Sequence, residues 1–199
     1  MMDLESDRMK NIQLSVKDIE TERKVVLEER SQRTDSDPGA LFAEQRRAAM
    51  YLNHPYGIPI IGWRHEIENL NKKDIIAFYK KYYAPNSATL IIAGDVVPLK
   101  VKDLAKKYYG RLTPIVGLKK RQRRQEPTHL AERKIIFEDP RVSQPYLIRN
   151  YLVPERNQAD QKVPAILTVL AELLGGNENT SVLGKALQLA TKKACLLYT

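Results

Sequence analysis

Residues 15–34, SVKDIETERKVVLEERSQRT, carry the clearest secondary-structure signal in the sequence. Ser15, followed three residues later by Asp18, is typical of a capping box, in which each side chain accepts a hydrogen bond from the other residue's backbone N–H. Apolar side chains recur after this pair with the period of an α-helix. The stretch therefore predicts one well-marked helix.

Two acidic side chains share the apolar face of this expected helix. At about 100° per residue, Glu22 and Glu29 fall in the same arc as Ile19, Val25 and Val26. A carboxylate on such a face needs an ion pair, hydrogen bonds or a metal, because burying an unpaired charge is unfavourable. The two glutamates are about 10.5 Å apart along the helix axis, so one would be a metal ligand and the other a supporting group.

A simpler interpretation of the same pattern stays open. A glutamate on a helix is usually solvated or salt-bridged, and three arginines in this stretch are available as partners: Arg23, Arg30 and Arg33. Periodicity alone does not decide between a salt-bridged pair and a metal site.

Beyond this helix, local signals predict an α+β chain. Proline, glycine and capping signals predict five further helices, at residues 40–52, 71–83, 98–110, 159–174 and 181–190. Stretches rich in β-branched, aromatic and other apolar residues predict three strands, at residues 88–93, 133–138 and 146–153.

The composition, with 43% hydrophobic and 29% charged residues, is typical of an ordinary globular protein. The net charge is +9, and residues 118–134 carry +5 of it. Because this run contains no aromatic residue to stack on a base, a solvated basic linker is favoured over a nucleic-acid site. No apolar run approaches the roughly 20 residues of a membrane-spanning helix. Cys195 is the only cysteine, which excludes an intrachain disulfide.

Several motifs, in order along the chain, resemble the M16 family of zinc peptidases, the pitrilysin and mitochondrial-processing-peptidase type. Residues 22–29, ERKVVLEE, resemble the metal-ligand helix of that family, and residues 53–57, NHPYG, resemble a loop that follows it. Residues 78–86, FYKKYYAPN, are similar to its next helix, and residues 138–145, EDPRVSQP, to the opening of its second homologous half. The resemblance covers nearly the whole chain.

This resemblance implies a mostly antiparallel sheet flanked by helices. It divides the chain into an incomplete first half at residues 1–114, a basic linker at 115–132 and the start of a second half at 133–199. It also implies a Zn²⁺ ion held by a His-x-x-Glu-His helix and by a glutamate of a later helix. By position that later ligand is Glu29, and Glu22 is the supporting acid that orients it.

The His-x-x-Glu-His motif itself does not occur in this sequence. The three histidines are His54, His65 and His129, and none of them belongs to such a motif. His54, on a proline-containing loop, is expected to pack within the loop rather than to act as a catalytic group.

The resemblance therefore implies a fragment of a zinc-dependent metalloendopeptidase that hydrolyses peptides or processes leader sequences, and that is inactive as an isolated chain. Its expected partners are peptide substrates and a missing N-terminal segment or a homologous M16 half or subunit, with no nucleic acid and no membrane span. The alternative is a non-catalytic M16-like partner subunit that binds peptides or an active subunit. The compartment stays open between the bacterial envelope, periplasm or cytoplasm and the mitochondrial matrix.

Overall fold

The computed structural model describes residues 1–119 and 121–194, so Lys120 and Cys195 lie outside the described residues. The chain forms two compact units, Met1–Tyr146 and a second unit that begins at Leu147. No helix of the described residues is long and apolar enough to cross a lipid bilayer.

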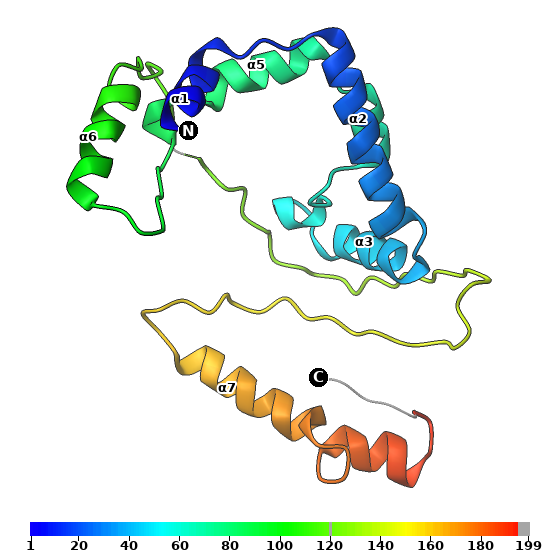
Figure 1. Ribbon diagram of the computed structural model, residues 1–199. Helices are drawn as coiled ribbons and strands as arrows, with labels where there is room; N and C mark the ends of the chain where they lie inside the picture. Colours follow the sequence, from blue (N-terminus) through cyan, green and yellow to red (C-terminus); the bar gives the residue numbers. More distant parts are fainter. Residues whose placement is uncertain (120, 195–199) are drawn as a thin grey trace. The chain divides into compact units, whose positions relative to one another are not determined.

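Helices account for the regular structure of both units (Figure 1). The first unit contains α1 (Met2–Asn11), α2 (Val16–Arg30), α3 (Pro38–Met50), α4 (Arg64–Asn69), α5 (Lys72–Tyr82) and α6 (Pro98–Tyr109), with short π or 3₁₀ turns at Ser31–Asp35, Pro55–Gly57 and Pro85–Ser87. The second unit contains α7 (Lys162–Ala171) and π-helical turns at Glu172–Gly176 and Gly184–Ala190.

The helices α2 and α5 begin where their capping signals predict them, because such signals act over a few residues. The Ser15 hydroxyl accepts a hydrogen bond from the N–H of Asp18 at 3.1 Å, and the Asp18 carboxylate accepts one from the N–H of Ser15 at 2.7 Å. The predicted capping box of α2 is therefore confirmed. At the start of α5, the side-chain oxygen of Asn71 accepts a hydrogen bond from the N–H of Asp74 at 3.2 Å.

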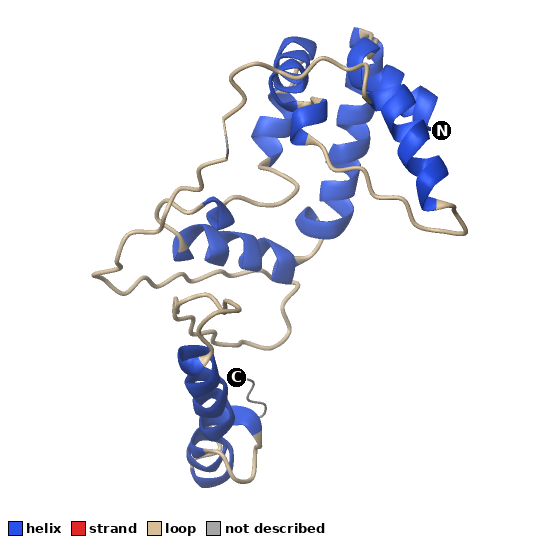
Figure 2. Cartoon of the chain, turned by 90° about the vertical axis from the view of Figure 1, so that its left-hand side faces the viewer, coloured by secondary structure: helices blue, strands red, loops and turns tan. Residues whose placement is uncertain are grey.

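The predicted α+β class, with a mostly antiparallel sheet flanked by helices, is wrong for this structure. Figure 2 shows helices and loops, and the described residues contain no β-strand. The three stretches predicted as strands, residues 88–93, 133–138 and 146–153, lack a backbone hydrogen-bond ladder to a partner. A strand is stable only when a neighbouring strand satisfies its backbone groups, so a strand-like composition alone does not create a sheet.

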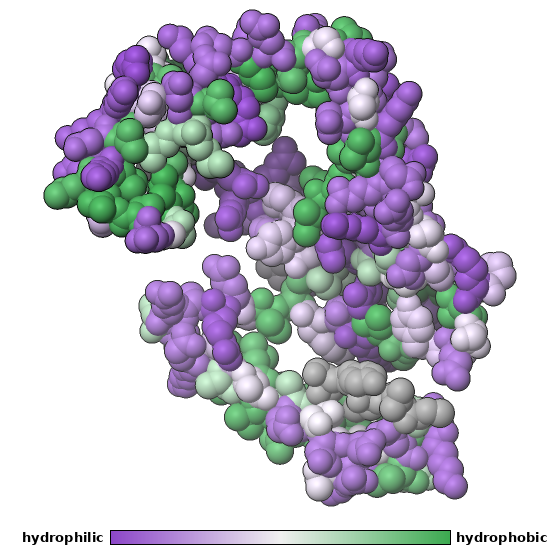
Figure 3. All heavy atoms as spheres, in the orientation of Figure 1, coloured by the Kyte–Doolittle hydropathy of each residue, from purple (hydrophilic) through white to green (hydrophobic). Residues whose placement is uncertain are grey.

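The buried apolar side chains of the described residues are few. They are Ile19 of α2, Ile67 of α4 and Ala84, which follows α5. Large apolar side chains remain exposed elsewhere, including Ile91, which is 84% exposed, and Leu99 in the first turn of α6. Figure 3 shows hydrophobic residues gathered on the surface around α6. Exposed apolar surface of this kind is typical of a region that contacts another part of a protein.

Candidate functional site

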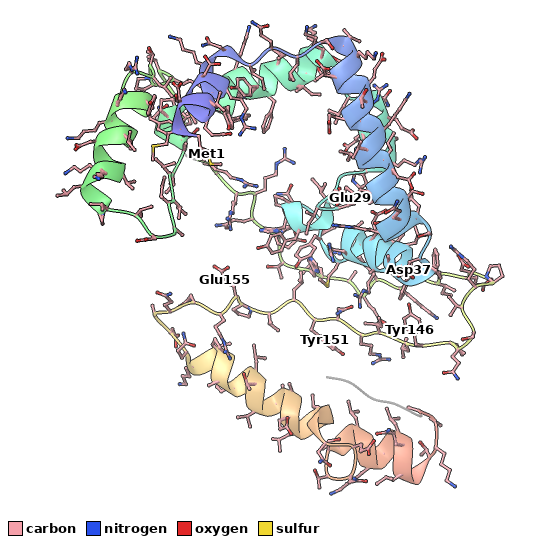
Figure 4. The ribbon with its side chains drawn as sticks, in the orientation of Figure 1. Met1, Glu29, Asp37, Tyr146, Tyr151 and Glu155 are labelled. Carbon is pink, nitrogen blue, oxygen red and sulfur yellow. The ribbon has the colours of Figure 1, made fainter. Side chains whose placement is uncertain are left out.

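α2 carries both acidic residues that the sequence analysis selects. Glu22 is exposed, whereas Glu29, labelled in Figure 4, has 43% of its side chain exposed. The Glu29 carboxylate lies 2.9 Å from a guanidinium nitrogen of Arg33, one turn further along. Glu28 is exposed and accepts a hydrogen bond from the side-chain amide of Gln32 at 2.9 Å. Of these three carboxylates, Glu29 is the least exposed, and it is still accessible to solvent.

The ion pair between Glu29 and Arg33 is easily exchanged. The Arg33 side chain is 76% exposed, and the two residues are four apart on the helix. Exposed pairs at this spacing stabilise a helix by only about 0.3–0.5 kcal/mol. Little free energy would therefore be lost if Glu29 left Arg33 for a metal ion, and a carboxylate oxygen is a ligand that zinc accepts.

The residues that the structure describes around Glu29 do not form a complete metal site by themselves. The described residues contain no group of three His, Cys, Asp or Glu side chains that could hold a metal ion. Catalytic zinc is usually held by three protein ligands. The residues described here therefore do not fit a whole zinc site, and Glu29 could supply only one of the ligands that such a site needs.

The C-terminal end of α2 is fixed by a buried arginine that directly follows Glu29. Arg30 is only 3% exposed, and its guanidinium donates hydrogen bonds to both carboxylate oxygens of Glu44 in α3, at 2.8 and 2.9 Å. It also donates to the carbonyl oxygen of Gly62 at 2.8 Å. Its Nε lies 3.3 Å from a carboxylate oxygen of Asp35, as an ion pair without hydrogen-bond geometry. Arg30 thus ties α2 to the turn after it, to α3 and to the loop before α4.

The sequence analysis missed this role, because it considered Arg30 only as a partner for the glutamates of its own helix. A signal was present in the spacing. Arg30 lies eleven residues after Ile19, which at 100° per residue brings the two within about 20° of each other around the helix. Glu22 and Glu29 lie about 60° and 80° from Ile19. The buried line of α2 therefore runs through Ile19 and Arg30, and the two glutamates lie together on one side of it.

The loop after α3 contains a small aromatic cluster around His54. The His54 ring accepts a hydrogen bond from the N–H of Tyr56 at 3.2 Å, and the two ring centroids are 4.4 Å apart. The Tyr51 ring is 5.6 Å from that of His54. The prediction that His54 packs within its loop is therefore confirmed.

The same loop binds a carboxylate from the basic run. One oxygen of Glu126 accepts a hydrogen bond from the N–H of Leu52 at 2.5 Å, and the other accepts from the N–H groups of Asn53 at 3.0 Å and His54 at 2.7 Å. The His129 ring lies 2.6 Å from the first oxygen. Burial raises the pKa of Glu126, but the hydrogen bonds from His129 and from the three N–H groups outweigh burial and lower this pKa to about 2. The side chain is thus held as a carboxylate at neutral pH.

Residues 69–192 match the sequence model of a known domain, described as the Peptidase M16 inactive domain. The matched region begins after α2, so it does not include Glu22 or Glu29.

Named relatives and one solved structure agree with this match. Over 188 residues, the chain is 29% identical to "Zinc protease PqqE" of Helicobacter pylori, an alignment that covers 90% of this chain and 40% of that protein. Over 109 residues it is 29% identical to "Probable mitochondrial-processing peptidase subunit beta" of Schizosaccharomyces pombe, covering 55% of this chain and 24% of that protein. A crystal structure of a protease from Helicobacter pylori is 32% identical, with a TM-score of 0.52, and the match covers 64% of this chain and 29% of that one. The chain therefore spans less than half the length of each of these relatives.

Proposed function

The chain belongs to the M16 peptidase family, and from this premise we propose that it is part of a zinc-dependent metalloendopeptidase that hydrolyses peptides or processes leader sequences. In this proposal Glu29 is one ligand of the zinc ion, and Glu22, on the same helix, is the supporting acid. The remaining ligands come from a His-x-x-Glu-His segment in another part of the protein or in a homologous M16 half or subunit.

One observation carries this proposal. Glu29 is held only by a weak and exchangeable pair with Arg33, while the next residue, Arg30, is buried and bound to Glu44. The backbone that carries Glu29 is therefore fixed, although its carboxylate is free to take another partner. A metal ligand requires this combination, because a fixed backbone limits the entropy lost when a metal binds.

The same proposal divides the chain into parts of two homologous halves. Residues 1–114 would be the C-terminal part of a first M16-like half, residues 115–132 its connector and residues 133–199 the start of a second half. The isolated chain would be inactive, because its described residues lack the further ligands that a catalytic zinc ion needs.

Joining the chain to a His-x-x-Glu-His helix tests the proposal. The joined protein, produced in cis or by co-expression, should cleave an unstructured peptide, and a zinc chelator should abolish the cleavage. The matched control carries Gln in place of the Glu of that motif and should show no cleavage. Cleavage of the peptide by the isolated chain at the rate of the joined protein would refute the proposal.

A second candidate function is a non-catalytic M16-like subunit that binds peptides or an active subunit. The observation that favours it is the match of residues 69–192 to the domain described as inactive. A joined protein that binds an M16 subunit or a peptide, but neither retains zinc nor cleaves the peptide, would support this candidate over the first.

A further inference from the structure

Residues 126–146 form an extended segment of the first unit that lies alongside α3 and the loop after it. We call this segment the strap. Figure 1 shows this part of the chain, coloured yellow-green, running beside α3. Besides Glu126, four side chains of the strap contact α3 or the turn before it. Arg133 donates a hydrogen bond to the carbonyl of Ala49 at 2.5 Å and Arg141 one to the carbonyl of Ser36 at 2.7 Å, while the rings of Phe137 and Tyr146 lie 5.9 and 5.7 Å from that of Phe42.

The segment before the strap, which carries most of the basic side chains of residues 118–134, is also anchored at its other end. The side chain of Asn86 accepts a hydrogen bond from the N–H of Ile115 and donates one to the carbonyl of the same residue, both at 3.0 Å. Ten residues, 116–125, therefore lie between the anchor at Ile115 and the anchor at Glu126. The basic side chains described among them are all exposed: Lys119, Arg121, Arg123 and Arg124.

Glu126 contacts the rest of the first unit through several hydrogen bonds to one carboxylate. Its carboxylate accepts hydrogen bonds from three successive backbone N–H groups and contacts a histidine ring, and the side chain is 15% exposed. Hydrogen bonds to a charged acceptor are roughly twice as strong as those between neutral groups. The side-chain amide of Asn53 adds a hydrogen bond to the carbonyl of Gln125 at 3.1 Å. The contact therefore holds both the side chain and the backbone at the start of the strap.

We propose that Glu126 is a latch that fixes residues 126–146 to the first unit, so that residues 116–125 lie between two anchored ends. The joint that leads to the second unit then lies after Tyr146, where that unit begins. This inference does not depend on zinc or on catalysis. The M16 resemblance places the start of the second homologous half at residue 133, whereas the latch places the joint between the two units after Tyr146. The first residues of the second homologous half would therefore be bound to the first unit.

Amide hydrogen exchange tests the latch in the intact chain. The change is Glu126→Gln, which keeps the size of the side chain but removes one acceptor oxygen and the negative charge. Exchange at the N–H groups of Leu52, Asn53 and His54 should become at least about tenfold faster, because these donors lose a charged acceptor. The control is Glu132→Gln, which removes an exposed carboxylate of the strap itself and should leave these rates unchanged.

Limited digestion with trypsin gives a second measurement, with its control in the same chain. In the unaltered chain, cleavage at Arg123 and Arg124 should precede cleavage at Lys134, because only the first two lie in the loop between the anchors. In Glu126→Gln, Lys134 should be cut at a rate close to that of Arg123. If exchange at Leu52 to His54 and the order of cleavage are both unchanged in Glu126→Gln, while the helical content is retained, the latch does not exist.

Discussion

Replacing Glu29 by glutamine, in a protein that joins this chain to a His-x-x-Glu-His helix, should lower peptide hydrolysis by at least about 100-fold. A neutral amide oxygen is a much poorer zinc ligand than a carboxylate, so the ion would be lost or displaced. The rate should be measured with saturating peptide, together with the zinc that the protein retains after dialysis. Both quantities should fall together, because they depend on the same ligand.

The neighbouring Glu28 provides the matched control. Glu28→Gln makes the same chemical change one residue earlier, where the side chain points about 100° away around the helix. Its carboxylate is exposed and paired with Gln32, so activity and zinc content should stay within about twofold of the unaltered protein. Glu22→Gln should lie between the two, with a loss of about 10-fold to 100-fold, as expected of a group that supports a ligand. An effect of Glu28→Gln as large as that of Glu29→Gln would refute the ligand assignment.

Replacing Arg30 by methionine should destabilise the first unit by about 3–5 kcal/mol. The change would leave the Glu44 carboxylate, whose side chain is 8% exposed, buried and without its bidentate partner. A buried charge that loses its partner is far more unfavourable than an exposed one. Unfolding by urea, followed through the helical circular dichroism signal, should show the transition at a lower urea concentration.

Two further variants test whether the loss of stability in Arg30→Met comes from the unpaired charge of Glu44 or from a general loss of packing. The double change Arg30→Met with Glu44→Leu replaces the ion pair by apolar side chains and should recover most of the lost stability, because no unpaired charge remains. Arg33→Met removes an exposed arginine from the turn that follows and should change stability by less than about 0.5 kcal/mol. A double variant less stable than Arg30→Met alone would show that the pairing of Arg30 with Glu44 is not what fixes α2.

Several helices could be predicted from the sequence because their signals are local, whereas α4, which has no side-chain cap, is not among those that the sequence predicts. Ser15 with Asp18, Asn71 with Asp74, and Pro98 at the start of α6 each act within one turn of the helix that they begin. The sheet could not be predicted in the same way. The composition of residues 88–93 favours a strand, but a strand forms only where a partner lies alongside, and no such partner is present in the part of the chain that the structure describes.

The same distinction applies to the candidate site. The location of Glu22 and Glu29 on one helix follows from local periodicity. The same periodicity places Arg30 near Ile19 on the buried line, but it does not predict the partner of Arg30, since Glu44 lies fourteen residues away, beyond a turn whose path the sequence does not specify. The contact of Glu126 with the loop at Leu52 joins residues 74 apart, so no local sequence pattern predicts it.

The zinc content of the isolated and the joined protein, measured side by side after dialysis, tests most directly whether this chain supplies one ligand to a shared site. The joined protein, with an upstream His-x-x-Glu-His helix, should retain about one zinc ion per molecule. The isolated chain should retain almost none, because one carboxylate does not hold zinc against dialysis. An isolated chain that retains about one zinc ion per molecule, or a joined protein whose zinc content is unaffected by Glu29→Gln, would contradict this account.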